Sequence, residues 1–268
     1  HDTSRHLVVL ARNMEGYRNL MKLTSKAYLE GFYYRARVDK ALLAECSGGL
    51  VGMSACLNGE IAARLLMGDE SGAEKAAGEF REIFGQDCFY LELMENGLPE
   101  QKEANGRLLG LAKKLSMPLV ATNDCHYLKK EDAEAHEVLL CIQTGKTMDD
   151  PVRMRFKTDE FYFKSPEEMK SSFEYCPEAI ENTLIIAEMC NLSLDFNKVY
   201  LPHFELDKGV SAEEHLRRLA REGLEKLFPS IPGSDQADVR ERYRKRLESE
   251  LDIIESMGFP GYFLIVAD

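Results

Sequence analysis

The sequence predicts an α/β protein whose first half alternates strands with helices and whose second half is mainly helical. Within residues 6–128, a short apolar run followed by a stretch with helical spacing of apolar residues recurs four times. Repeated strand–helix units are typical of parallel sheets and β/α barrels. Beyond residue 130 the helix-start signals continue while the strand signal fades. We therefore expect a βα region followed by a mainly helical one.

The elements of the first half are delimited by turn residues and by changes in apolar periodicity. Strands are predicted at 6–11, 50–55, 88–94 and 119–122. Helices are predicted at 17–29, 39–45, 60–67, 71–84 and 99–115. Gly31 is a suitable stop for the first helix, and Pro99 fits the first turn of the last.

The second half carries clear helix-start signals. Ser165-Pro-Glu-Glu168 and Ser211-Ala-Glu-Glu214 each place a hydroxyl N-cap before acidic residues of a first turn. Helices are predicted at 131–143, from 165, at 177–190, at 211–227 and at 237–256, with one further strand at 160–163. Tyr200–Pro202 is interpreted as a linker or edge segment. Gly258–Gly261 ends the preceding helix before an apolar element at 262–266.

Composition limits the functions that the chain can have. Of 268 residues, 44% are hydrophobic and 30% charged, as in ordinary soluble globular proteins. Lys and Arg total 34 and Asp and Glu 46, a net charge of −12. This balance disfavours a protein that wraps nucleic acid over its whole surface, because phosphate binding needs clustered cations. It leaves room for a local basic patch or an acidic metal pocket.

The seven cysteines are scattered, odd in number and form no Cys-x-x-Cys pair, which indicates reduced cytosolic thiols. The sequence has no signal peptide and no apolar run near the ~20 residues that a membrane span needs. We expect a cytoplasmic protein with no membrane partner. The chain begins at His1 without Met and stops at Asp268 directly after an apolar run, so we expect it to be cut from a longer one.

Two candidate metal ligands follow the strand at 119–122. In an extended chain, residues two apart point to the same side, so Asp124 and His126 would project together from the carboxyl end of this strand. In α/β folds that end commonly carries the chemistry. A carboxylate and an imidazole side by side suit zinc or manganese. The alternative is a polar turn in which Asp124 caps the helix that follows.

Four side chains could share one metal pocket: His6, Cys56, Asp124 and His126. Imidazole and thiolate favour zinc, while the carboxylate admits manganese or magnesium. Taken alone, His6 is also explained as a hydrogen-bonded histidine at the start of a strand. Cys56 alone is better explained as a buried structural cysteine.

A basic segment lies between the two regions. Arg153, Arg155 and Lys157 alternate with Met154 and Phe156, so an extended backbone would place all three cations on one face. Such a face could contact nucleic-acid phosphates, or it could be an ordinary solvated surface. No Walker-type glycine loop, His-Glu-x-x-His or Gly-x-Ser-x-Gly motif is present.

With these residues in view, the chain resembles the C-family replicative polymerases, the family of the alpha subunit of bacterial DNA polymerase III. The resemblance runs in order along essentially the whole chain and includes the run Ala-Thr-Asn-Asp-x-His-Tyr-Leu. The segments that carry it are His6–Leu20, Gly31–Tyr34, Ser54–Ile61, Tyr90–Leu93, Ala121–Leu128, His136–Ile142 and Met257–Val266.

The resemblance implies a fold and a domain division. Residues 1–198 would be the larger, C-terminal part of a polymerase-and-histidinol-phosphatase (PHP) domain, an incomplete, distorted seven-stranded β/α barrel. Residues 199–268 would be a linker and the start of the polymerase core, entering the palm. Because the first strands of the barrel would be missing, we expect an unpaired sheet edge and doubtful folding in isolation.

The resemblance also implies a metal site. Family members that keep the site bind two or three metal ions through up to nine ligands, and His6, Cys56, Asp124 and His126 match the later ones by motif. The bound metals would be zinc or manganese and would serve 3′–5′ exonuclease activity in some members, while in others the site is degenerate and structural. The family's opening His-x-His and the next ligands would lie before His1.

The parent protein implied by the resemblance is a DNA-directed DNA polymerase of chromosome replication. Its palm carboxylates, which hold magnesium for nucleotidyl transfer, would lie beyond Asp268, so the fragment alone is expected to be inactive. Its partners would be primer–template DNA, deoxynucleotides, the sliding clamp and other replisome subunits. The alternatives are a stand-alone PHP metal-dependent phosphoesterase and a non-catalytic scaffold.

Overall fold

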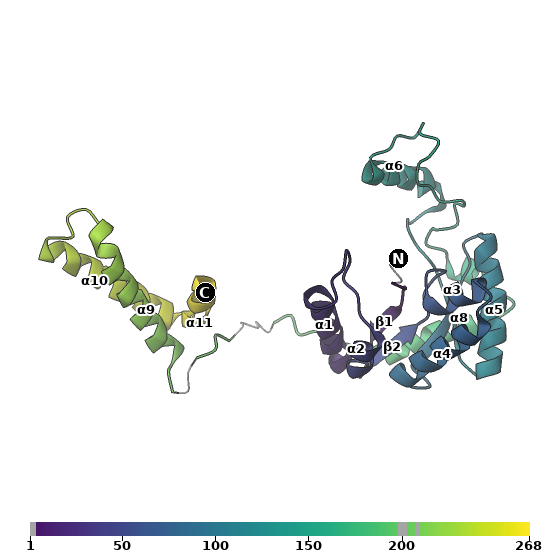
Figure 1. Ribbon diagram of the computed structural model, residues 1–268, viewed down its shortest axis with the longest axis horizontal. Helices are drawn as coiled ribbons and strands as arrows, with labels where there is room; N and C mark the ends of the chain where they lie inside the picture. The colour runs from purple at the N-terminus through teal and green to yellow at the C-terminus, as the bar shows by residue number, and fades with distance from the viewer. Residues whose placement is uncertain (1–3, 198–202, 207–208) are drawn as a thin grey trace. The chain divides into compact units, whose positions relative to one another are not determined.

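The computed structural model describes residues 4–197, 203–206 and 209–268 (Figure 1). The chain divides into two compact units, His1–Leu194 and Asp195–Asp268. The linker predicted at Tyr200–Pro202 lies outside the described residues. None of the helices within the described ranges combines the length and apolar character that a membrane crossing requires.

The first unit contains the strands and helices predicted for it, except the strand at 160–163. Its strands are β1 (Val8–Ala11), β2 (Leu50–Met53), β3 (Phe89–Met94) and β4 (Leu119–Thr122). Its helices are α1 (Met14–Leu29), α2 (Lys40–Glu45), α3 (Glu60–Leu66), α4 (Glu70–Phe84), α5 (Pro99–Leu115), η1 (Lys130–Asp132), α6 (Ala133–Thr144), α7 (Pro166–Ser172) and α8 (Pro177–Met189).

Local signals located several helix starts correctly. The capping box predicted at Ser165 is present: its hydroxyl accepts from the Glu168 backbone N–H, and the Glu168 carboxylate accepts from the Ser165 N–H. The strand predicted at 160–163 is wrong. That segment makes a single bridge, between Tyr162 and Tyr127, because a ladder needs consecutive pairs along a neighbouring strand.

The sheet has the order β1-β2-β3-β4, and strand direction changes within it. The pairs β2–β3 and β3–β4 are parallel, whereas β1 runs antiparallel to β2. The four-fold βα repeat had indicated a parallel sheet. The chain returns through α1 and α2 to the end of β1 before β2 starts, so Ala11 pairs with Leu50 and the Arg12 N–H donates to the Gly49 carbonyl at 2.8 Å. The start of α1 also lies close to this turn, since a Cβ at Gly16 would lie 1.9 Å from the Gly49 carbonyl oxygen.

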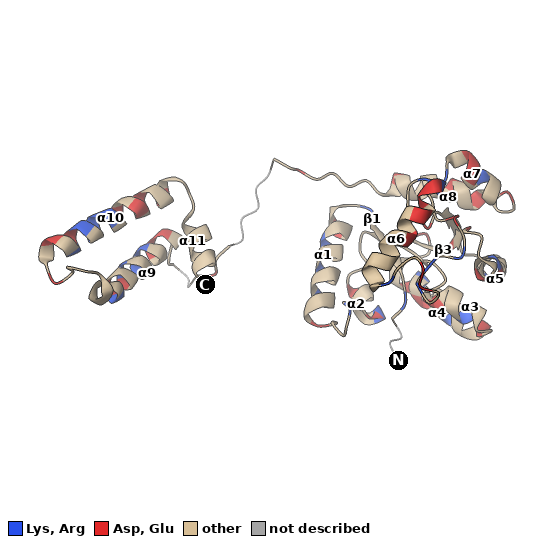
Figure 2. Ribbon diagram, turned by 90° about the horizontal axis from the view of Figure 1, so that it is seen from above, with Lys and Arg blue, Asp and Glu red and all other residues tan. Residues whose placement is uncertain are grey.

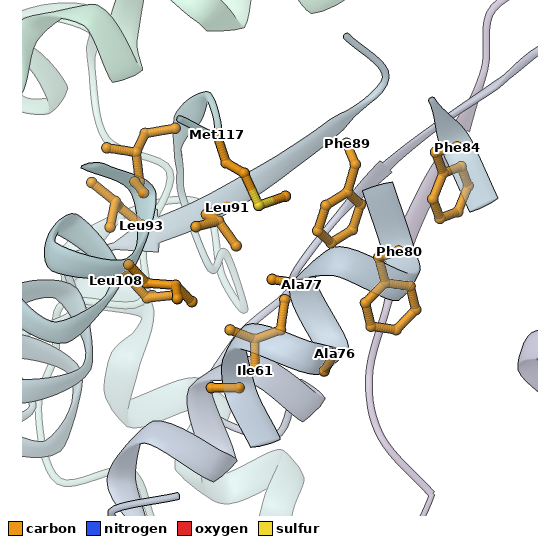
Figure 3. Packing of buried hydrophobic residues seen from close by; sticks show 14 of the residues in the cluster. Ile61, Ala76, Ala77, Phe80, Phe84, Phe89, Leu91, Leu93, Leu108 and Met117 are labelled. Atoms are coloured by element: carbon orange, nitrogen blue, oxygen red, sulfur yellow. The ribbon is translucent and has the colours of Figure 1, made fainter. Parts of the chain in front are cut away.

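The core lies on both faces of the sheet. Phe89, Leu91 and Leu93 of β3 are fully buried against α3, α4 and α5, where they meet Ile61 and Leu108 (Figure 3). On the other face a smaller cluster is covered by α8; its members are Val51, Met53, Tyr90, Val120 and Ile186. Burial on both faces explains why the strands read as continuous apolar runs.

The observed architecture is mixed α/β, with an open four-stranded sheet in the described part of the first unit. β1 and β4 are its edge strands, and β1 pairs with β2 alone among the described residues.

The second unit is helical and held together by ion pairs between helices. Its elements are α9 (Ala212–Leu227), η2 (Phe228–Ser230), α10 (Ala237–Ser256) and α11 (Pro260–Ala267). Lys, Arg, Asp and Glu intersperse along α9 and α10 (Figure 2). Arg217 of α9 contacts Glu248 at 2.8 Å and Asp252 and Glu255 at 2.5 Å each. The charges of α10 thus bind α9 in addition to forming i, i+4 pairs within α10, such as that of Arg246 with Glu250.

Candidate metal centre

The candidate site is formed where the parallel strands end. Because β2, β3 and β4 run in the same direction, the residues that follow them meet at one edge of the sheet. There a pocket of about 450 Å³, which we call the strand-edge pocket, opens to solvent. The residues that line it include His6, Val8, Ala55, Cys56, Met94 and Asp124.

His6 reaches this pocket because β1 is antiparallel. A residue at the start of a parallel strand would lie at the opposite edge of the sheet. Here the start of β1 lies beside the end of β2, and the His6 backbone N–H donates to the Asn58 carbonyl at 3.1 Å. The His6 ring Nδ1 is 3.4 Å from Cys56 Sγ. Two predicted ligands that are fifty residues apart in the chain are therefore in contact.

His126 takes a different position from the one expected. Its Nδ1 lies 3.7 Å from an Asp124 carboxylate oxygen but nearer, at 3.1 Å, to the Asp124 carbonyl. The ring packs edge-on against Phe156 and Phe161, with ring centroids 4.7 and 5.4 Å away. Alternation along a strand does not extend to His126, because β4 ends at Thr122 and the His126 N–H donates to Phe161 instead.

Three of the four predicted ligands thus line one pocket, while His126 belongs to a neighbouring aromatic cluster. In the described ranges, no three His, Cys, Asp or Glu side chains are already grouped closely enough to hold a metal ion. The donor types nevertheless fit one: a thiol, an imidazole and a carboxylate converge on the same cavity. Binding would require side-chain movements that bring these donors closer together.

The thiol in this pocket lies near two negatively charged groups. Burial is the main reason that the pKa of the Cys56 thiol is raised, and the negative charges of Asp124 and Glu92 raise this pKa further. Arg5 also lines the pocket but is exposed at its rim. Because a metal binds the thiolate, binding at this position would release the Cys56 proton and favour higher pH.

The comparisons with known proteins agree along the chain. Residues 1–96 match the PHP domain family, and residues 214–268 match the family described as the bacterial DNA polymerase III alpha NTPase domain. The DNA polymerase III subunit alpha of Treponema pallidum is 45% identical over 264 residues, which are 98% of this chain and 22% of that protein. The chain is similar along almost its whole length to this DNA polymerase III alpha subunit.

Other DNA polymerase III alpha subunits match over the same extent. The subunit alpha of Thermus aquaticus is 41% identical over 315 residues, 98% of this chain and 26% of that protein. The subunit alpha of Helicobacter pylori strain 26695 is 40% identical over 287 residues, 98% of this chain and 23% of that protein. The chain therefore spans about a quarter of the length of these DNA polymerase III alpha subunits.

Sequence reasoning missed one charged residue beside the candidate site. Glu92 lies in the middle of β3 with only 3% of its surface exposed. Its carboxylate accepts a hydrogen bond from the Ala55 N–H at 2.8 Å and one from Thr122 Oγ1 at 2.5 Å. Burial, chiefly, raises the pKa of this carboxyl. The signal was a single acid inside the apolar run Phe89–Met94.

Two cations of the predicted basic segment form ion pairs with carboxylates of this chain. Arg153 Nε lies 2.8 Å from Glu137 of α6, and Lys157 Nζ lies 3.0 Å from Glu100 of α5. Arg155 is exposed. The three cations therefore do not form one free cationic face in this structure.

Proposed function

We propose that this chain is part of the catalytic alpha subunit of a bacterial replicative DNA polymerase, acting in the cytoplasm in chromosome replication. The identity to DNA polymerase III alpha subunits over 98% of the chain supports this proposal. A stand-alone phosphoesterase is not favoured, because the match continues through residues 214–268, where the polymerase-specific family begins.

In this proposal each region of the chain has its own role. Residues 1–198 form the C-terminal part of a PHP domain, an incomplete β/α barrel that braces the polymerase core. Residues 199–268 form a linker and the start of the palm. The parent subunit acts on primer–template DNA and deoxynucleotides with magnesium, alongside the sliding clamp and other replisome subunits. Of the basic segment, Arg155 is the cation best placed to meet DNA, because it is exposed while Arg153 and Lys157 form ion pairs with Glu137 and Glu100.

The strand-edge pocket is proposed to bind zinc or manganese for 3′–5′ exonuclease activity. The observation that carries this proposal is the convergence of Cys56, His6 and Asp124 on one cavity. A bound divalent metal supplies Lewis acidity toward a phosphodiester and activates water. His6, Cys56 and Asp124, which line the pocket, would hold the metal, and His126 would join them as a fourth ligand.

Replacing the thiol ligand tests the exonuclease proposal. In the full-length subunit, we expect Cys56→Ser to slow metal-dependent 3′–5′ degradation of a 5′-labelled single-stranded DNA by at least about tenfold, because a hydroxyl is a poor zinc ligand. Cys125→Ser is the matched control, because this thiol is exposed and absent from the pocket lining.

The two parts of the proposal fail separately. A wild-type subunit that extends primers but degrades no DNA with either metal would remove the exonuclease role and leave the bracing role. Wild-type protein that degrades DNA but cannot extend primers would contradict the polymerase assignment. Equal degradation by the Cys56 variant would exclude this pocket as the nuclease site.

A further inference from the structure

A buried carboxylate joins the strand ends that carry the pocket. Glu92 of β3 accepts from the backbone N–H of Ala55, the residue directly before Cys56. Its other oxygen accepts from Thr122, the last residue of β4 and two positions before Asp124. The Glu92 N–H, in turn, donates to Ser54 Oγ at 2.8 Å. We call Glu92, Ala55 and Thr122 the Glu92 bridge.

The backbone at Ala55 depends on this bridge. Ala55 has φ of +61°, in the left-handed region that residues other than glycine rarely adopt. This conformation turns the chain sharply out of β2, points the Ala55 N–H back at Glu92 and carries Cys56 into the pocket. Strained residues of this kind persist only where the surroundings hold them, and the Glu92 carboxylate supplies that hold.

Burying a carboxylate at this core position costs free energy. A buried carboxylate is usually paired with a cation, yet both hydrogen-bond donors of Glu92 are neutral, and the nearby charge of Asp124 is also negative. An apolar side chain in the middle of β3 would pack without that penalty. What Glu92 adds is a link between the two segments that bear the pocket's ligands.

We propose that Glu92 is a positioning residue of the strand-edge pocket, which sets the separation of Cys56 and Asp124 through the backbone of Ala55 and the hydroxyl of Thr122. It lies outside the ligand set, because it does not line the pocket and its two oxygens accept from Ala55 and Thr122. The inference rests on the proposed metal site, and it adds a residue outside the predicted ligand set. It follows that the bridge controls how well the pocket binds a metal that needs both ligands.

Cobalt binding tests this inference without relying on activity. Co²⁺ titrated into the full-length subunit reports affinity, and its thiolate charge-transfer band reports the Co–Cys56 bond. We expect Glu92→Met, which removes both acceptors, to weaken Co²⁺ binding by about tenfold and to reduce this band. Glu92→Gln should stay close to wild type, because its amide can accept from Ala55 and donate to the Thr122 hydroxyl. Glu103→Met, an exposed replacement on α5, is the matched control.

Thr122→Val keeps the inference testable if Glu92→Met does not fold. It preserves side-chain shape and releases only the end of β4, so we expect a smaller loss of Co²⁺ affinity. Wild-type affinity and spectrum in a folded Glu92→Met protein, or in Thr122→Val if Glu92→Met does not melt cooperatively, would overturn the inference. Failure of wild-type protein to bind Co²⁺ would instead refute the metal pocket itself, and the inference with it.

Discussion

We expect Asp124→Asn to lower the affinity of the full-length subunit for zinc by about 100-fold, since a pocket ligand should matter at least as much as the outer partners of metal ligands do. At a zinc concentration 100 times the wild-type Kd, bound metal stabilises the wild-type fold by about 2.7 kcal/mol, whereas the variant would gain only about 0.4 kcal/mol. Thermal melting with and without zinc measures this difference.

The same substitution should not harm the metal-free protein. The charge of Asp124 raises the pKa of both Cys56 and Glu92, so its removal relieves repulsion in the absence of a cation. A metal-free melting temperature equal to or above that of wild type is therefore expected. Asp149→Asn, at an exposed position outside the pocket lining, should leave both values unchanged. Zinc stabilisation of Asp124→Asn equal to that of wild type would remove Asp124 from the ligand set.

The second large effect is expected in the core. Phe89 is fully buried, and its ring stacks on Phe80 and Phe84 with centroids 5.2 and 5.9 Å away (Figure 3). Phe89→Ala should lower the free energy of unfolding of the first unit by about 3–5 kcal/mol, because the lost burial is compounded by a cavity. A larger residue at the neighbouring Gly52 could not fill this cavity, because a Cβ there would lie 2.6 Å from the Phe84 ring.

Urea unfolding of the full-length subunit followed by circular dichroism measures this effect in the transition of the first unit. Phe163→Ala is the control, because that side chain is 68% exposed and should change stability by no more than about 0.5 kcal/mol. A loss below about 1 kcal/mol for Phe89→Ala would show that these rings do not form the main core.

Element type and approximate position could be predicted from sequence because they depend on local signals. Apolar periodicity and caps placed the helix 99–115 and the strand 119–122 with the ends that the structure has. Strand direction could not be predicted in this way, because an apolar run reads the same in either direction. β1 is antiparallel because the chain returns to the end of β1 before β2 starts, and the place of that return is a tertiary property.

The same distinction between local signals and tertiary contacts applies to the candidate site. His6, Cys56 and Asp124 were grouped by chemistry and by their positions at strand ends, and they line one pocket. His126 departs because the period-two rule applies only while the backbone remains a strand, and β4 has ended before it. Glu92 was not predicted as part of the site, because a lone acid in an apolar run does not indicate which neutral groups surround it.

The central claim is that Cys56, His6 and Asp124 hold a metal together, and zinc X-ray absorption of the full-length subunit tests it most directly. The account predicts zinc retained after dialysis, with one sulfur at about 2.3 Å and nitrogen or oxygen ligands at about 2.0–2.1 Å. The sulfur shell should disappear in Cys56→Ser and persist in Cys125→Ser. Zinc bound by oxygen and nitrogen alone in the wild-type protein, or no retained zinc, would contradict the account.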